Sequence, residues 1–99
     1  MEKRLVILGA GESGVGAAML GKAKGFDVFV SDMGEIKDKY RSILEKENIA
    51  YESGKHSEEK IMNAGLVIKS PGIPDKAPLI KALVAKGIDV VSEIEFAAH

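Results

Sequence analysis

Apolar residues follow two different repeats along this chain, and the repeats alternate. Short continuous aliphatic runs, the first at residues 4–8, are followed by stretches in which apolar residues recur every three or four positions. Runs of the first kind are typical of strands buried on both faces of a parallel sheet. Stretches of the second kind are typical of amphipathic helices. The pattern therefore predicts strands that alternate with helices.

Five strands and four helices follow from this pattern. The expected strands are residues 4–8, 27–31, 49–52, 66–69 and 88–91. The expected helices are residues 15–24, 36–47, a short one from the N-cap Ser57 to Gly65, and 78–86, and residues 92–99 resemble the opening of another. Glycines at 25, 65 and 87 are expected to end helices. Right-handed crossovers then give an α/β fold, an open five-stranded parallel sheet with helices on both faces.

Length and composition limit the kind of protein. The 99 residues fit one domain, with 45% hydrophobic and 29% charged residues, as in soluble globular proteins. Lys and Arg number 14 against 15 Asp and Glu, so the basic excess needed to bind nucleic acid or a membrane surface is missing. Without cysteine there is no disulfide or zinc–thiolate site. No apolar run approaches the ~20 residues of a membrane span, and we expect a cytoplasmic location.

Residues 9–14, Gly-Ala-Gly-Glu-Ser-Gly, fit the pattern G-x-G-x-x-G between the first expected strand and the first expected helix. Gly9 allows the tight turn out of the strand, and Gly14 lets the helix pack closely on the sheet. Gly11 leaves the backbone open to a phosphate, because no Cβ stands in the way. The free N–H groups of the helix N-terminus favour a diphosphate. We therefore favour an anionic nucleotide ligand over a purely structural turn.

Three polar residues near this turn each have two interpretations. Ser13 can donate to a phosphate oxygen or cap the helix. Glu12 must turn away from a bound diphosphate or pair with a cation, because like charges repel. Asp32 follows the second expected strand. Its carboxylate can accept hydrogen bonds from a ribose hydroxyl or a base N–H, or it can cap a turn.

The loop at residues 70–74, Ser-Pro-Gly-Ile-Pro, follows the fourth expected strand. It lies at the carboxyl edge of the sheet, where open α/β sheets bind ligands. Its prolines fix its path, and Gly72 permits a positive φ or a close approach. The loop can present Ser70 and the Gly72 N–H to a ligand, or it can be a stiff connector.

The remaining titratable residues predict neither a catalytic residue nor a metal site. Glu93 and Glu95 are two apart, so on a helix they do not share a face, and we interpret them as solvated charges or partners of the helix N-terminus. His56 and His99 are isolated in sequence and are expected at the surface.

Together these motifs resemble the N-terminal domain of the Mur ligases, in particular of members that add D-glutamate. The matching segments are residues 6–14, 30–32, 69–74 and 92–96, in the family's order and spacing. The sister ligase that adds L-alanine is similar in the first loop but lacks the S-P-G-I-P loop. Two residues depart from the family's pattern: Glu12 replaces a residue that is often apolar, and Met33 lacks the polar side chain that some members carry.

The resemblance implies a Rossmann-like domain, residues 1–99, that binds the UDP moiety of UDP-N-acetylmuramoyl-L-alanine and does not use NAD. Residues 12–14 would line the diphosphate, Asp32 and Met33 the uracil pocket, and residues 70–73 a second wall. The full set of expected binding residues is Gly9, Gly11, Glu12, Ser13, Gly14, Asp32, Met33, Ser70, Pro71, Gly72 and Ile73.

The resemblance also implies a reaction for the complete enzyme. ATP and Mg²⁺ would form an acyl-phosphate on the L-alanine carboxyl, and the amine of D-glutamate would attack it. The sequence has no G-K-[ST] triplet to hold the ATP phosphates. We therefore expect an excised substrate-binding domain that is inactive alone, with the remaining domains of the ligase as partners.

Two alternatives use the same residues. An NAD-binding regulatory or dehydrogenase module would also have the glycine motif and Asp32. It leaves the S-P-G-I-P loop unexplained, and the second mononucleotide-binding half that nicotinamide needs is missing. A scaffold domain with a vestigial ligand site is the other alternative.

Overall fold

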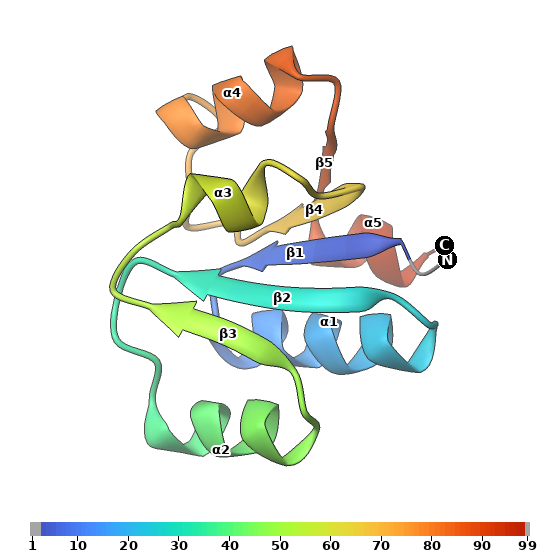
Figure 1. Ribbon diagram of the computed structural model, residues 1–99, viewed down its shortest axis with the longest axis vertical. Coiled ribbons are helices and arrows are strands. Elements are labelled where there is room, and N and C mark those ends of the chain that lie inside the picture. The colour runs from blue at the N-terminus through green and yellow to red at the C-terminus, as the bar shows by residue number, and fades with distance from the viewer. Residues whose placement is uncertain (1–2, 99) are drawn as a thin grey trace.

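The computed structural model describes residues 3–98, in which strands and helices alternate along the chain (Figure 1). The strands are β1 (Arg4–Leu8), β2 (Asp27–Asp32), β3 (Ala50–Ser53), β4 (Leu66–Lys69) and β5 (Asp89–Val91). The helices are α1 (Glu12–Ala23), α2 (Asp38–Lys46), α3 (Glu58–Ile61), α4 (Pro78–Ala85) and α5 (Glu93–Ala97). The predicted order of elements is confirmed.

The five strands form one parallel sheet in the order β3-β2-β1-β4-β5. β1 pairs with β2 on one side and with β4 on the other. The chain first adds β2 and β3 on one side of β1 and then returns to add β4 and β5 on the other side. The order reverses between β1 and β4. In open α/β sheets ligands bind at this switch point, outside the carboxyl ends of the strands. The turn after β1 and the loop after β4 both emerge there.

Alternate residues of β1 face two separate helix layers. Leu5 and Ile7 pack in one cluster with residues of α1, α2 and α5, whereas Val6 and Leu8 pack in another with residues of α3 and α4. In Figure 1, α1 and α2 lie toward the β2–β3 side and α3 and α4 toward the β4–β5 side. The side chains on both faces of β1 are fully buried from Leu5 to Leu8, which explains why these consecutive residues are all aliphatic. The predicted helices on both faces are confirmed.

Glycines were predicted to end three helices, and the structure confirms two of them. Gly25 and Gly87 have φ values of +91° and +86° just after α1 and α4, as expected for glycines that end helices. The prediction that the short helix ends at Gly65 is wrong, because α3 ends at Ile61 and the φ of Gly65 is not positive. A Cβ on Gly65 would lie 2.8 Å from the exposed side chain of Lys3, which would have to move. α2 ends at Lys46, and Asn48, just beyond it, adopts a φ of 57°.

Helix starts depart further from prediction. α1 begins at Glu12, three residues earlier than expected, because the extended Gly11 serves as its N-cap without a side chain. Ser57 occupies the N-cap position of α3, but its hydroxyl makes no capping hydrogen bond and donates to Glu52 instead. The first turn of α1 therefore lies closer to the sheet edge than the sequence suggested.

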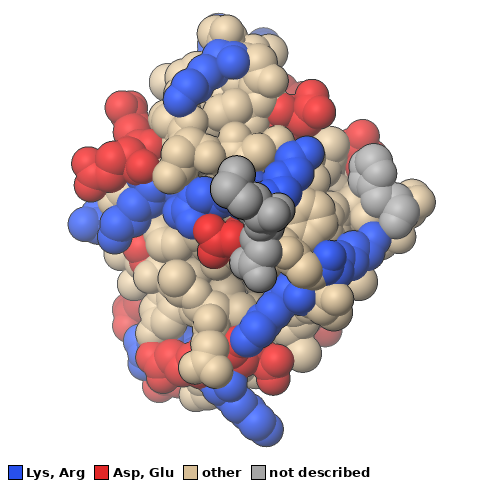
Figure 2. All heavy atoms as spheres, turned by 45° about the vertical axis from the view of Figure 1, so that its right-hand side comes forward, with Lys and Arg blue, Asp and Glu red and all other residues tan. Residues whose placement is uncertain are grey.

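The charged surface is mixed in sign. On the face shown in Figure 2, Lys and Arg side chains are interspersed with Asp and Glu, without a broad area of one sign. Within residues 3–98, no helix has the length and apolar character to cross a membrane.

Candidate functional site

A cavity of about 240 Å³, here called the glycine-turn cavity, opens at the carboxyl ends of the central strands. Its lining comes from four chain segments: Gly9, Ala10, Gly11, Asp32, Met33, His56, Ser70, Gly72 and Ile73. Most of the residues predicted as binding residues from the sequence are in this lining. Those outside it are Glu12, Ser13, Gly14 and Pro71. Folding therefore brings the glycine turn, Asp32 and the second loop to one place.

Gly9 and Gly14 are required by the turn itself. Gly9 has a φ of +108°, and its N–H donates to the Ser31 carbonyl at 2.8 Å. A Cβ on Gly14 would lie 2.0 Å from the Gly9 carbonyl oxygen, a distance no side chain can occupy. The start of α1 is thus pressed against the end of β1, and only glycines allow this contact.

Gly11 is different, because nothing in the fold requires a glycine there. Its φ is −82°, which any residue adopts, and a Cβ would meet no atom within 4 Å. The space beside Gly11 is open to a ligand. The first main-chain hydrogen bond of α1 runs from the Val15 N–H to the Gly11 carbonyl. Among the described residues, none of the main-chain hydrogen bonds outside the helices and strands is donated by the N–H groups of residues 12–14, as expected for the first turn of a helix.

The side chains of the first turn of α1 do not enter the cavity. Glu12 is exposed, and none of the described residues forms an ion pair with it. The Ser13 hydroxyl lies 3.3 Å from Oε1 of Glu93 in α5. The interpretation of Ser13 as a helix cap is therefore wrong, and its link to α5 is new.

Asp32 ties the end of β2 to the glycine turn. Its Oδ2 accepts from the Ala10 N–H at 2.7 Å, and its Oδ1 accepts from the Gly34 N–H at 2.8 Å. The interpretation as a turn cap is thus confirmed. A carboxylate oxygen has two lone pairs, so Asp32 keeps the capacity to accept a further hydrogen bond from a ligand.

The second loop is fixed against the first. The Ser70 N–H donates to the Leu8 carbonyl at 3.0 Å, and Lys69 Nζ donates to the Ile73 carbonyl at 2.6 Å. Gly72 does not adopt a positive φ, so that explanation for a glycine is wrong, and close approach is the one left. Pro71, a predicted wall residue, is exposed and lies in a different hollow, described below.

His56 is the site residue that sequence reasoning missed. It was expected at the surface, but it is half-buried in the cavity wall with Nδ1 2.7 Å from the Ser31 hydroxyl. Burial lowers its pKa and outweighs the opposing effect of the Glu52 and Asp32 carboxylates. A usable signal was its position shortly after β3, since Asp32 ends the neighbouring strand. His99 lies outside the described residues.

Behind His56 is a buried polar network. Ser31 is fully buried and Glu52 is 7% exposed. Glu52 accepts from the Ser31 hydroxyl at 2.8 Å, from the Ser57 N–H at 2.8 Å and from the Ser57 hydroxyl at 2.6 Å. Burial acts to raise the pKa of Glu52, but these hydrogen bonds and the charge of Lys60 outweigh it and hold the pKa below its usual value. Glu52 is therefore an ionised carboxylate.

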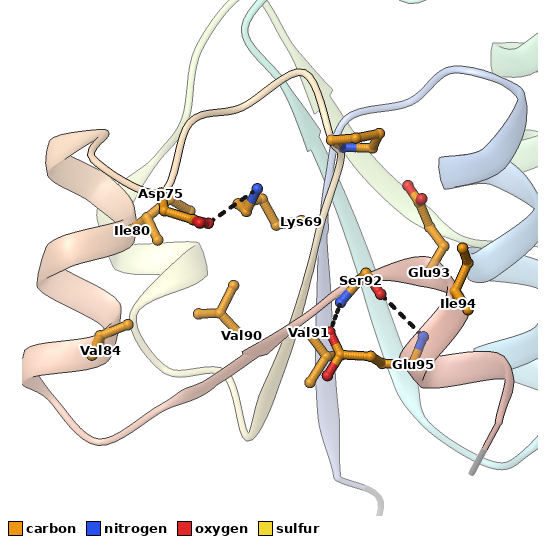
Figure 3. A pocket seen from close by; sticks show the side chains of 11 residues that line it. Lys69, Asp75, Ile80, Val84, Val90, Val91, Ser92, Glu93, Ile94 and Glu95 are labelled. Atoms are coloured by element: carbon orange, nitrogen blue, oxygen red, sulfur yellow. Dashed lines mark hydrogen bonds and ion pairs between the residues drawn. The ribbon is translucent and has the colours of Figure 1, made fainter.

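A larger hollow of about 640 Å³, here called the edge groove, lies between α4, β5 and α5 (Figure 3). Its apolar residues include Val84, 61% exposed, and Ile94, 82% exposed. Two pairs of its polar residues are bound to each other. Lys69 Nζ forms an ion pair with Asp75 Oδ1 at 3.3 Å. Ser92 and Glu95 form a capping box, in which the side chain of each accepts from the main-chain N–H of the other. The interpretation of Glu95 as a partner of the helix N-terminus is confirmed.

Comparison with known proteins identifies related sequences and folds. A family model described as "Mur ligase MurD-like, N-terminal domain" matches residues 3–92. A UDP-N-acetylmuramoylalanine–D-glutamate ligase of Bacteroides thetaiotaomicron is 65% identical over 97 residues, and one of Christiangramia forsetii is 60% identical over 98. A murein peptide ligase of Psychrobacter arcticus superposes with a TM-score of 0.85 at 21% identity, which concerns the fold alone.

The matches differ greatly in how much of each protein they cover. They span 98% and 99% of this chain but 22% of each of the two relatives. The structural match spans 97% of this chain and 20% of the other. This chain thus corresponds to about a fifth of the length of its relatives.

Proposed function

Because this chain belongs to the family of MurD-like N-terminal domains of the Mur ligases, we propose that it binds the UDP moiety of UDP-N-acetylmuramoyl-L-alanine. The domain, residues 1–99, would serve a ligase that adds D-glutamate during synthesis of peptidoglycan precursors. The observation that supports this best is the glycine-turn cavity, in which Gly11, Asp32 and the second loop meet. An NAD-binding module is not favoured, because the family match is to Mur ligases.

The diphosphate would lie beside Gly11, at the N-terminus of α1. The first-turn N–H groups of α1, at residues 12–14, and the helix dipole both favour an anion there. The side chain of Glu12 is free to remain in solvent. The uracil and ribose would lie toward Asp32 and Met33, with residues 70–73 as the second wall. The diphosphate is thus held by backbone groups more than by lysines.

A chemical-shift titration tests this proposal directly. UDP and UDP-N-acetylmuramoyl-L-alanine should shift the amide signals of Gly11, Ser13, Asp32 and Gly72, and NAD should not. Saturable binding of NAD without binding of UDP would contradict the proposal.

Gly11→Val tests the place of the diphosphate. The valine side chain meets no protein atom near its Cβ, so the fold should be kept, while UDP should bind about tenfold more weakly or worse because the methyl groups occupy the phosphate approach. Gly16→Val is the matched control, since Gly16 lies in the same helix and a Cβ there is also unobstructed. Equal UDP affinity in both variants would mean that the diphosphate does not approach Gly11.

Amide-bond formation would require the rest of the ligase. The sequence has no G-x-x-G-K-[ST] loop, so its residues do not fit ATP and Mg²⁺. We propose that these cofactors bind in the remaining domains, for which the relatives have ample additional length. In the cytoplasm, the 99-residue chain alone would bind the nucleotide without reaction. Phosphate release from ATP by this chain with both substrates present would contradict that assignment.

A further inference from the structure

His56 is placed in the glycine-turn cavity by a hydrogen-bond network that also decides which of its ring nitrogens carries the proton. Ser31 Oγ has a single proton and three neighbours within hydrogen-bond distance. They are Glu52 Oε2 at 2.8 Å, the Lys55 carbonyl at 3.1 Å and His56 Nδ1 at 2.7 Å. Glu52 and the Lys55 carbonyl can only accept, since Glu52 is ionised.

The single proton of Ser31 must therefore go to one of the two acceptors. If this proton pointed at Nδ1 instead, neither the Glu52 carboxylate nor the Lys55 carbonyl would receive a hydrogen bond from Ser31. The lone pairs of Ser31 Oγ would then face the lone pairs of both oxygens, and Ser31 is fully buried, so water could not relieve the repulsion. Nδ1 must then be the donor, and Ser31 Oγ accepts from it. Burial favours the neutral ring through its lowered pKa. Neutral His56 is thus held as the Nδ1–H tautomer, and its Nε2 carries a lone pair.

Nε2 is left as an accessible acceptor. It has no hydrogen-bond partner among the described residues, and none of their buried side-chain nitrogens or oxygens lacks a partner. Nε2 is therefore not buried. His56 lines the cavity together with Asp32 and Gly11, in the space where the nucleotide would lie.

We propose that His56 is a ligand-binding residue whose Nε2 accepts a hydrogen bond from an N–H or O–H donor of the bound uridine nucleotide. This inference rests on the proposed binding of UDP. The donor is either the imide N–H of the base or a ribose hydroxyl. Either group can donate one hydrogen bond to the lone pair of an sp² nitrogen. Ser31 and Glu52, which do not reach the ligand, act as positioning residues that fix the tautomer.

Nitrogen NMR of the histidine rings in the 99-residue chain gives the first test. Without ligand, His56 Nδ1 should be protonated and Nε2 unprotonated at neutral pH. Saturating UDP should shift the Nε2 signal strongly, because that nitrogen becomes a hydrogen-bond acceptor. A protonated Nε2 in the free chain, or an Nε2 signal unchanged by saturating UDP, would overturn the inference.

The variant His56→Asn separates the ligand contact from the structural one. The asparagine amide can still donate to Ser31 from near the Nδ1 position, but nothing replaces Nε2. We expect an unchanged melting temperature and a UDP affinity reduced about three- to tenfold. An affinity equal to that of the wild type, with the fold intact, would overturn the inference.

Three analogues identify the donor: N3-methyl-UDP, 2′-deoxy-UDP and 3′-deoxy-UDP. The analogue that lacks the donor should bind equally well to the wild type and to His56→Asn. An identical reduction for UDP and all three analogues would mean that Nε2 meets no ligand donor, and would overturn the inference. Absence of UDP binding by the wild type would overturn the proposed function as well, so the two failures are distinguishable.

Discussion

The glycine-turn cavity and the edge groove are two hollows of the same sheet, and the smaller has the chemistry of a binding site. The groove, at about 640 Å³, is larger than the cavity, at about 240 Å³. The charged groups of the groove all have protein partners: Lys69 pairs with Asp75, Glu93 accepts from Ser13 and Glu95 accepts from Ser92. The cavity adjoins the N-terminus of α1, whose first N–H groups have no partner within a helix, and it is lined by a histidine whose Nε2 is accessible. Unused hydrogen-bonding capacity, more than volume, distinguishes a site for a polar ligand.

The two hollows also differ in how firmly their walls are held. β1 is the central strand of the sheet and leads directly into the glycine turn of the cavity. It pairs with strands on both sides, and its side chains are fully buried from Leu5 to Leu8. β5, beside the groove, pairs only with β4, and Val90 and Val91 are partly exposed. A site at the centre is therefore built on a rigid frame, whereas the groove lies at the edge of the sheet.

The largest effect is expected from Gly14→Ala, which would disturb the frame of the cavity. The new Cβ would meet the Gly9 carbonyl oxygen, a main-chain atom that cannot rotate away. We expect a loss of about 3 kcal/mol in the free energy of unfolding, measured by urea denaturation. Gly16→Ala is the control and should be stabilising by about 0.5–1 kcal/mol, because a Cβ is unobstructed there and alanine favours helix. Equal stability of the two variants would refute the close contact.

A smaller loss is expected from Glu52→Ala. The Ser57 N–H and hydroxyl would lose their acceptor, and the buried Ser31 hydroxyl would keep only the more distant Lys55 carbonyl, at a cost of about 2 kcal/mol in the free energy of unfolding. Glu59→Ala, which removes an exposed carboxylate of α3, should change it by less than about 0.5 kcal/mol. The His56 tautomer should also be disturbed in Glu52→Ala alone, and an undisturbed ring would argue against the network.

Acid should weaken the polar network in two stages. The pKa of His56 is lowered in the folded state, so the unfolded chain takes up the proton first and stability falls as the pH drops below about 6.5. The pKa of Glu52 is also lowered, so its contribution is present above its unfolded pKa and is lost as the pH falls through the folded value. Melting temperatures measured between pH 7 and pH 3 should show the upper stage disappear in His56→Asn and the lower stage in Glu52→Gln. Retention of both stages would contradict these assignments.

The weakest effects come from exposed apolar side chains, one in each hollow. Met33 is 61% exposed and lines the cavity, and Ile94 is 82% exposed and lines the groove. Met33→Ser should weaken UDP binding about threefold, because less apolar surface is buried on binding. Ile94→Ser should leave the UDP affinity unchanged and the free energy of unfolding within about 0.5 kcal/mol. Calorimetric titration measures the UDP affinity of both variants. If the groove were the nucleotide site, Ile94→Ser would weaken UDP binding more than Met33→Ser.

The fold could be predicted because its signals are local. β1 was predicted with its observed bounds, since five consecutive aliphatic or strand-favouring residues end at a glycine turn. Gly25 and Gly87 end helices through their own backbone conformations. The start of α1 was misplaced, because the N-cap Gly11 carries no side chain to mark it.

The site could be predicted only in part, because some of its residues depend on distant partners. Asp32 and the loop at 70–73 follow strands directly, and the parallel order brings them to one edge. His56 has no motif of its own. Its place depends on a hydrogen bond with Ser31, 25 residues earlier in the chain, which no local pattern reveals.

The construction of the cavity from separate segments also bears on the order of folding. Its walls come from residues 9–11, from 32–33, from 56, and from 70, 72 and 73, each at or after the end of a different strand. An intermediate that has formed only β1, α1 and β2 has two of these four segments and cannot enclose the nucleotide. Contacts between such distant segments form late, because closing long loops costs entropy before the contacts reward it. A ligand at 100 times its Kd would therefore favour the completely assembled chain by about 2.7 kcal/mol, and binding would report that folding has finished.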